Sequence, residues 1–283
     1  MRRSLSTGLL LLLLPLPAAD ADQPFLVAAH RGGRGIAPEN TLGAFRLSHA
    51  TWGAQGIWLE MDLHLTADGV PVIIHDADLS RTTTCTGLVH EKLLSELAGC
   101  DASESFSGWG AFEPIPTLRA VLDEGCEAGW RLMIEIKDVP TDPDFDPSGA
   151  SKVAGVLDEL ATRIDCTRAA WAERISFQSF WPPSLDHLEL AAPEFDTIFL
   201  TTSDLVNDLG FPAASNIAYA TARGYEVSAP DEGADDLDAT TIAGAHAAGR
   251  IVIPWTVNDA ARIAGLRAAG ADGVITDLPA LAY

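Results

Sequence analysis

Short apolar runs rich in β-branched residues alternate with alanine-rich segments of helical periodicity from residue 25 to residue 283. The runs that predict strands are Phe25–His30, Ile57–Asp62, Val72–His75, Arg131–Lys137, Arg174–Phe180, Asp196–Thr201, Glu226–Ala229, Arg250–Val257 and Gly273–Thr276. The segments that predict helices are Thr41–Trp52, Thr117–Ala128, Ser151–Ile164, Pro183–Leu190, Ala214–Arg223, Thr240–Ala248 and Asp259–Ala269. Such alternation is typical of a parallel sheet with helices outside it.

The number of strands favours a closed barrel. Val72–His75 follows the preceding strand through the turn Ala67-Asp68-Gly69, so these two strands are expected to form a hairpin. The other eight strands occupy about 250 residues, which is typical of the (β/α)8 TIM barrel. A doubly wound open sheet is the alternative, but no G-x-G-x-x-G motif follows the first strand. We expect residues 77–116 to be a short insertion over the barrel mouth, between barrel strands 2 and 3.

Residues 1–21 have the order of a secretory signal peptide. Two arginines precede the apolar run Leu9–Leu14, and Ala19-Asp20-Ala21 gives a small-x-small cleavage pattern. The apolar run is shorter than the roughly 20 residues of a membrane span. We therefore expect an exported protein, periplasmic or extracellular, with one domain at residues 22–283 and no stable membrane anchor.

Four cysteines, Cys85, Cys100, Cys126 and Cys166, fit export to an oxidising compartment. They form no C-x-x-C motif, which argues against a zinc knuckle or a thioredoxin-type site. Three pairings are possible. Cys85–Cys100 is favoured because it would close one loop, and Cys126–Cys166 is plausible because each residue ends a helical segment shortly before a predicted strand.

The composition limits the classes of partner. With 47% hydrophobic and 20% charged residues, the chain is globular. It has 40 acidic and 18 basic residues and a formal net charge of −22, which becomes −23 once the predicted signal peptide is removed. This charge excludes a cationic nucleic-acid surface and disfavours anionic membranes. An anionic substrate would have to be held by local positive charge.

Polar side chains gather at the carboxyl ends of the first strands, where barrel enzymes carry their active sites. Glu60 and Asp62 lie two residues apart and share one face of a strand, as do Glu135 and Lys137 on another. Three carboxylates at one mouth need a cation between them to stay ionised, and oxygen ligands favour Ca²⁺ or Mg²⁺. Salt bridges to Arg31 and Lys137 are an alternative. A glycosidase-like acid pair is disfavoured, because carboxylates on alternate residues of one strand cannot flank a bond from opposite sides.

Two histidines at separate strand ends, His30 and His75, suit a general base and a general acid at neutral pH. Arg31 and Lys137 would supply the positive charge that a phosphate requires. Lys137 is one of three lysines in the chain. The other five histidines are expected to be structural or exposed.

Eleven ordered segments around these residues resemble the glycerophosphodiester phosphodiesterase family. The matching segments are His30-Arg31-Gly32, Pro38-Glu39-Asn40-Thr41, Glu60-Met61-Asp62, Thr66–Val72, His75-Asp76, Leu79–Thr83, Ile115–Leu118, Glu135-Ile136-Lys137, Ser176–Phe180, Trp255–Asn258 and Asp272–Pro279. The resemblance covers the chain from about residue 25 to the end.

The resemblance implies a TIM barrel that hydrolyses glycerophosphodiesters, as small-molecule substrates, to sn-glycerol 3-phosphate and an alcohol. It also implies a role for each site residue: the metal ligands Glu60, Asp62 and Glu135, the catalytic pair His30 and His75, the phosphate contacts Arg31 and Lys137, and the glycerol-pocket residues Trp255 and Phe180. The alternatives are a related phosphodiesterase acting on lysophospholipid and a barrel that only binds phosphodiesters. Trp109–Phe112 is the one candidate segment for contact with a lipid surface.

Overall fold

The computed structural model describes residues 24–162, 166–202, 216–234 and 237–283, so the predicted signal peptide lies outside the described residues. The strands are β1 Leu26–Ala29, β2 Trp58–Leu65, β3 Pro71–Ile73, β4 Arg131–Ile136, β5 Ile175–Ser179, β6 Asp196–Thr201, β7 Val227–Pro230, β8 Ile251–Val252 and β9 Gly273–Thr276. The helices are α1 Leu42–Trp52, α2 Leu94–Leu97, α3 Leu118–Ala128, α4 Ala150–Ala161, α5 Arg168–Trp171, α6 Pro182–Ala191, α8 Asn216–Arg223, α9 Ala239–Ala247 and α10 Ala260–Ala269.

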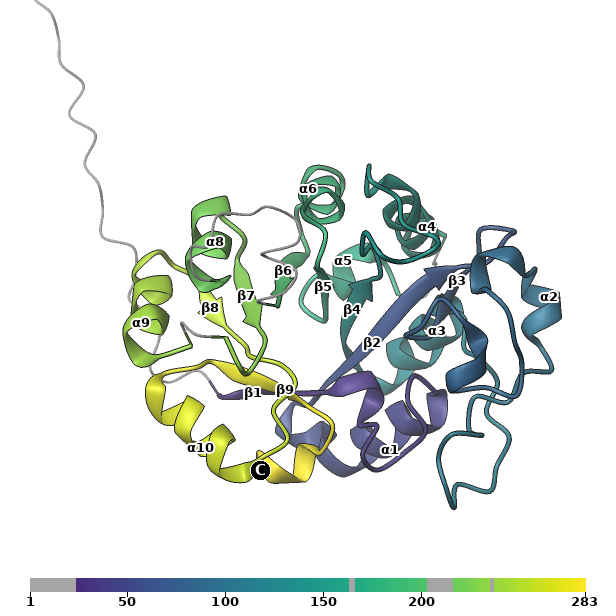
Figure 1. Cartoon of the computed structure of the whole chain (residues 1–283), viewed down its shortest axis with the longest axis horizontal. Coiled ribbons are helices and arrows are strands. Elements are labelled where there is room, and N and C mark those ends of the chain that lie inside the picture. Colours follow the sequence, from purple (N-terminus) through teal and green to yellow (C-terminus); the bar gives the residue numbers. More distant parts are fainter. Residues whose placement is uncertain (1–23, 163–165, 203–215, 235–236) are drawn as a thin grey trace, which may run out of the picture.

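Eight of the strands form the predicted (β/α)8 TIM barrel. They are hydrogen-bonded in the order β8-β7-β6-β5-β4-β2-β1-β9, and each neighbouring pair on this path is parallel. Backbone bonds between the β8 segment and β9 close the circuit: Ile275 N–H donates to Pro254 O at 2.9 Å, and Val257 N–H donates to Ile275 O at 3.0 Å. Helices such as α1, α6, α8 and α10 lie around the outside of the strands (Figure 1).

The predicted hairpin is confirmed. β3 pairs antiparallel with the end of β2, with Leu63 opposite Ile73. Residues 77–116 then leave the barrel and pack against this hairpin, where Ala67 N–H donates to Lys92 O at 2.8 Å. These residues, which include α2, lie at the edge of the molecule farthest from α9 (Figure 1).

Strand β8 is shorter than its predicted range, Arg250–Val257. Pro254 faces β9, where its carbonyl accepts from Ile275 N–H. Because proline has no N–H group, it cannot donate to that neighbour, and the regular ladder stops before it. Pairing with the β7 segment continues on either side of the proline, from Ile253 N–H to Ser228 O and from Trp255 N–H to Pro230 O. The prediction therefore placed the strand correctly but made it too long.

Side-chain caps fix where the outer helices begin. Thr41 and Thr117 accept hydrogen bonds from the backbone of α1 and α3, and Asp238 and Asp259 do the same for α9 and α10. Each cap satisfies a backbone N–H group that the first turn of a helix leaves without a partner. α5 was not predicted, because four residues are too few to show helical periodicity.

The core has two layers, as strand alternation requires. Leu59 and Met61 face outward and pack between the barrel and its helices. Met133, Leu200 and Ile275 belong to a smaller apolar cluster inside the barrel. The inward positions at the carboxyl ends of β2 and β4 are thus left to polar side chains.

The favoured disulfide and the one considered plausible are both present. Cys85 pairs with Cys100 across a Cα–Cα distance of 5.3 Å, and Cys126 pairs with Cys166 at 5.9 Å. Among the described residues, no helix combines the length and the apolar character needed to cross a membrane.

Candidate active site

A tight turn directly after β1 carries the first site residues. Arg31 has a φ of 52°, in the left-handed region that few side chains other than glycine adopt. Gly32 follows with a φ of 79°, and a Cβ atom there would lie 2.8 Å from the ring of Phe45. The turn aims the backbone N–H of Arg31 at Glu60 Oε2, 2.6 Å away.

Three carboxylates meet between β2 and β4. Asp62 and Glu135 are register partners on these adjacent strands, and Glu60 precedes Asp62 on the same face. One oxygen from each of the three lies within 4.8 Å of the other two, and all three side chains are buried. Asp62 Oδ1 has no hydrogen-bond donor within the part of the chain that the structure describes, and its ion-pair partner Lys137 Nζ is 3.7 Å away. An unsatisfied buried oxygen among hard oxygen donors is the arrangement that fits a divalent cation.

The protein alone does not stabilise three negative charges here. Burial and the neighbouring Asp62 and Glu135 carboxylates raise the pKa of Glu60 well above its ordinary value. Burial likewise raises the pKa of Glu135 to about 7, although Lys137 opposes the shift. For Asp62, burial is outweighed by His75, Lys137 and Arg31, and its pKa is held well below the ordinary value.

The salt bridges considered above are also present. Arg31 Nε lies 3.5 Å from Asp62 Oδ2, and Lys137 Nζ lies 2.8 Å from Glu135 Oε1. Both cations line the pocket, so they can pair with the carboxylates and still face a bound anion.

His30 is held at one nitrogen. Its Nδ1 donates to Asp277 Oδ1 at 2.6 Å, and the same oxygen accepts a hydrogen bond from Arg34 Nε at 2.8 Å. Asp277 Oδ2 accepts from Asn258 Nδ2 at 2.8 Å. Burial alone would raise the pKa of Asp277, but His30 and Arg34 lower it to about 2, so Asp277 is ionised. Burial lowers the pKa of His30, which favours the neutral imidazole.

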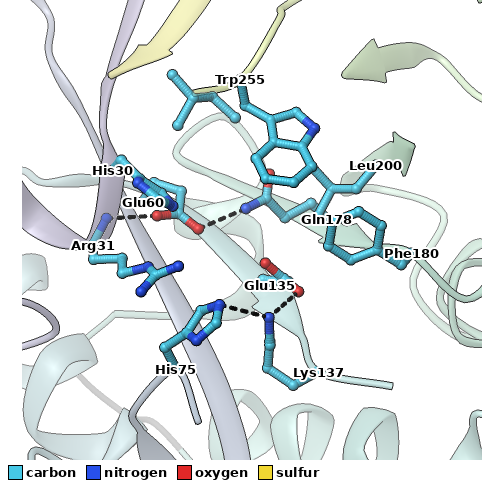
Figure 2. A pocket seen from close by; sticks show the side chains of 11 residues that line it. His30, Arg31, Glu60, His75, Glu135, Lys137, Gln178, Phe180, Leu200 and Trp255 are labelled. Carbon is cyan, nitrogen blue, oxygen red and sulfur yellow. Dashed lines mark hydrogen bonds and ion pairs between the residues drawn. The ribbon is translucent and has the colours of Figure 1, made fainter. Parts of the chain in front are cut away.

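His75 stands on the other side of the pocket. Its Nδ1 donates to Asp76 Oδ1 at 2.5 Å, and its Nε2 accepts from Lys137 Nζ at 3.2 Å. Figure 2 shows His75 and Lys137 together below Glu135, facing the space that His30 and Arg31 also line. The two predicted histidines therefore present ring nitrogens to one pocket from different strand ends.

The opposite wall of the pocket is apolar. The rings of Phe180 and Trp255 meet edge to face with centroids 5.3 Å apart, next to Leu200 (Figure 2). Ile275 also lines the pocket. Trp255 is fixed by a hydrogen bond from its Nε1 to Ala229 O at 2.9 Å. The pocket has a volume of about 150 Å³, which suits a small polyol better than a lipid chain. Every site residue named from the sequence lines this pocket except Asp62, which lies beneath it.

Two amide residues that hold the carboxylate cluster were not singled out from the sequence. Gln178 on β5 donates from Nε2 to Glu60 Oε1 at 2.7 Å, and Asn40 donates from Nδ2 to Asp62 Oδ2 at 2.8 Å. Gln178 lies two residues before Phe180, so strand alternation places both on the inner face. That spacing was the available signal. Neutral amides are less distinctive in a sequence than charged side chains, but these two donate hydrogen bonds that orient the carboxylates.

The comparisons with known proteins agree with this geometry. The profile of the glycerophosphoryl diester phosphodiesterase family matches residues 30–281. A glycerophosphodiester phosphodiesterase from Caldanaerobacter subterraneus subsp. tengcongensis is 32% identical over 254 residues, which cover 90% of this chain and 94% of that protein. One from Bacillus altitudinis is 30% identical over 255 residues, covering 89% and 94% respectively. The solved structure of an Oleispira antarctica phosphodiesterase in complex with the product sn-glycerol-3-phosphate superposes with a TM-score of 0.74 at 27% identity, covering 91% of this chain and 94% of that one. The chain belongs to the glycerophosphoryl diester phosphodiesterase family.

Proposed function

We propose that this enzyme hydrolyses glycerophosphodiesters to sn-glycerol 3-phosphate and an alcohol, with one divalent cation, Ca²⁺ or Mg²⁺, bound by Glu60, Asp62 and Glu135. The observation that carries the proposal is the buried, unsatisfied Asp62 Oδ1 within a cluster of three carboxylates beside two histidines. The product named for the Oleispira antarctica relative supports the choice of product.

Positive charge is concentrated where a phosphate would sit. A bound cation would act as a Lewis acid on a phosphoryl oxygen and balance the charge of the three carboxylates. Arg31 and Lys137 line the same pocket and stabilise the negative charge that develops on the phosphoryl oxygens as the bond breaks. This local charge allows an anionic substrate to bind despite the net charge of −22.

The histidines divide the proton transfers. His30 accepts the proton of the attacking oxygen as that oxygen bonds to phosphorus, and Asp277 stabilises the imidazolium that results. The attacking oxygen belongs either to water, which gives sn-glycerol 3-phosphate directly, or to the 2-hydroxyl of the glycerol, which gives a cyclic phosphate that water then opens. His75 acts from its imidazolium form, whose Nε2 gives its proton to the departing oxygen as that oxygen takes the electron pair of the broken P–O bond. The neutral ring that remains accepts the hydrogen bond of Lys137 at Nε2. Asp76 holds the Nδ1 of His75, so that Nε2 is the nitrogen that delivers the proton.

The apolar wall of the pocket favours a substrate with a glycerol group. Trp255 and Phe180 offer flat carbon surfaces on which the carbon face of glycerol can pack, next to the polar half of the pocket. We further propose that residues 22–283 form one exported domain after removal of the signal peptide, in the periplasm or outside the cell. The two disulfides support export.

The test is an assay of the purified protein with glycerophosphocholine, glycerophosphoethanolamine and lysophosphatidylcholine, each with Ca²⁺, Mg²⁺ or EDTA. We expect release of sn-glycerol 3-phosphate from the first two substrates, loss of turnover in EDTA and recovery with one of the ions. His75→Ala should lower kcat by roughly 10²–10⁴-fold, the usual contribution of a positioned acid. Full activity in EDTA would disprove the metal requirement. Faster cleavage of lysophosphatidylcholine would point to a lipid enzyme, and binding without turnover to a carrier barrel.

A further inference from the structure

Arg81 joins two carboxylates at the edge of the site. It lies in the short 3-10 turn Leu79–Arg81 that follows β3. Its Nε donates to Asp76 Oδ2, and its Nη2 donates to Asp76 Oδ1 at 3.1 Å. On its other side, Nη2 donates to Glu39 Oε1 at 2.7 Å and Nη1 donates to Glu39 Oε2 at 3.2 Å. The planar guanidinium thus holds both carboxylates in fixed positions.

Each carboxylate holds one residue that faces the substrate. Asp76 Oδ1 accepts the hydrogen bond from His75 Nδ1 at 2.5 Å. Glu39 Oε1 accepts one from Arg31 Nη1 at 3.0 Å. Arg81 therefore links the turn after β1 to the end of the β3 segment, and the two ends of this chain of contacts are His75 and Arg31.

Positive and negative side chains alternate along this series of contacts. Burial would raise the pKa values of Asp76 and Glu39, but hydrogen bonds from His75 and Arg81 keep the pKa of Asp76 low, and those from Arg81 and Arg31 keep that of Glu39 low. Both groups are ionised at neutral pH. Arg81 uses Nε, Nη1 and Nη2 on these carboxylates, and it is not among the residues that line the pocket.

We propose that Arg81 is a positioning residue that fixes His75 through Asp76 and Arg31 through Glu39. The inference rests on the proposed function, because it assigns His75 the task of protonating the departing alcohol. Without Arg81, Asp76 loses its anchor and His75 delivers its proton less effectively. Loss of the contact with Glu39 also leaves Arg31 less firmly positioned. Because Arg31 binds the phosphate, this second effect slows the reaction for every leaving alcohol.

The leaving group distinguishes these two effects. The choline oxygen of glycerophosphocholine needs a proton to depart, whereas p-nitrophenolate departs as a stable anion. Arg81→Gln should therefore lower kcat for glycerophosphocholine about 10- to 100-fold, the usual effect of losing a partner that orients a site residue. For the p-nitrophenyl ester of glycerol 3-phosphate, the loss should be at least about fivefold smaller. Asp76→Asn should reproduce the leaving-group dependence, and Glu39→Gln should slow both substrates equally.

Arg46→Gln is the matched control, because Arg46 also binds a carboxylate, Glu124, through two hydrogen bonds but lies on the outer surface of α1. We expect this control to keep wild-type activity. Arg81→Lys keeps the charge but cannot bind both carboxylates through paired donors, so it should recover part of the loss. Circular dichroism and the Tm check that each variant is folded.

Three results would overturn the inference. Activity of Arg81→Gln within twofold of Arg46→Gln would show that the contacts of Arg81 do not serve the reaction. An equal loss on both substrates would remove the link to His75. A further leaving-group-dependent loss from Arg81→Gln in a His75→Ala background would mean that Arg81 acts by another route. An inactive wild-type enzyme would instead refute the proposed function, and this inference would fall with it.

Discussion

The pKa values of Glu60 and Asp62 shift in opposite directions, although the two residues lie two positions apart on one strand. Both are buried, which by itself favours the neutral acid. Asp62 is surrounded by Arg31, Lys137 and His75, so its pKa falls well below the ordinary value, while Glu60 faces the other two carboxylates and its pKa rises. Of these two residues, Asp62 is therefore the one whose surroundings favour the ionised form, and its Oδ1 lacks a donor among the described residues.

This asymmetry predicts a large effect of Asp62→Asn on cation binding. The amide keeps the size of the side chain but removes one ligand charge, and ligand charge sets the affinity of oxygen sites for hard cations. We expect the affinity for Ca²⁺ or Mg²⁺, measured by isothermal titration calorimetry, to fall by at least about tenfold. Glu104→Gln removes an acidic side chain from an exposed position and should leave the affinity unchanged. An Asp62→Asn protein that binds the ion as tightly as wild type would contradict the assigned site.

The charged members of the site could be found from the sequence because a strand alternates its faces. Residues two apart must point to the same side, so the spacing of Glu60 with Asp62 and of Glu135 with Lys137 was sufficient. Orienting residues from distant parts of the chain could not be found in this way. Asp277 lies 247 residues from the His30 it holds, and only barrel closure brings the ends of the chain together.

At the scale of elements, the two disulfides close loops of different length. Cys85–Cys100 spans 15 residues within the segment between β3 and α3. Cys126–Cys166 spans 40 residues and joins the end of α3 to the residues just before α5. A crosslink restricts the unfolded chain more when the loop it closes is longer.

Removing the longer crosslink should therefore cost more stability. Chain-entropy arithmetic gives about 3 kcal/mol for the 15-residue loop and about 4 kcal/mol for the 40-residue loop. We expect the double variant Cys126→Ser/Cys166→Ser to unfold at a lower urea concentration than Cys85→Ser/Cys100→Ser. Each variant introduces two hydroxyl groups, so each serves as the control for the other. The reverse order of midpoints would show that local packing outweighs loop length.

The extents of the elements were harder to predict than their order. The apolar pattern at Arg250–Val257 correctly indicates a strand, but hydropathy does not report that Pro254 lacks a donor. α5 gave no signal because its four residues make a single turn. Caps at Thr41 and Thr117 fixed the starts of the longer helices within one residue of their predicted ranges. Periodicity thus locates an element, and backbone hydrogen bonding decides where it ends.

At the scale of the whole molecule, the two ends of the barrel serve different purposes. The carboxyl ends of the strands carry the site, and their buried charges are compensated by Arg31, Lys137 and a proposed cation. At the amino ends, Asp196 begins β6 and Glu226 directly precedes β7, and their two carboxyl groups interact. Burial and the nearby Glu226 raise the pKa of Asp196 to about 6.

This pair predicts a pH-dependent loss of stability. An acid whose pKa is higher in the folded state than in the unfolded state binds more protons when folded, so stability falls as the pH rises between the two values. For Asp196 this window runs from its ordinary value of 3.8 to about 6, and the penalty is complete above it. Asp196→Asn should therefore match wild type at pH 4 and exceed it at pH 7. Neighbouring groups desolvate the Asp196 carboxyl in part, but much of the residue remains open to solvent, which screens the repulsion. We therefore expect a gain below about 1 kcal/mol in the free energy of unfolding by urea.

The partner residue provides the decisive control. If the penalty arises from repulsion between the two carboxylates, Glu226→Gln should give a gain at pH 7 similar to that of Asp196→Asn, and the double variant should add little to either. Additive gains would show that each carboxylate is destabilised by its own surroundings and not by the other. Since the pair lies at the opposite end of the barrel from the site, kcat should not change in any of the three proteins. A change in kcat with an unchanged free energy of unfolding would contradict the separation of stability and activity between the two ends.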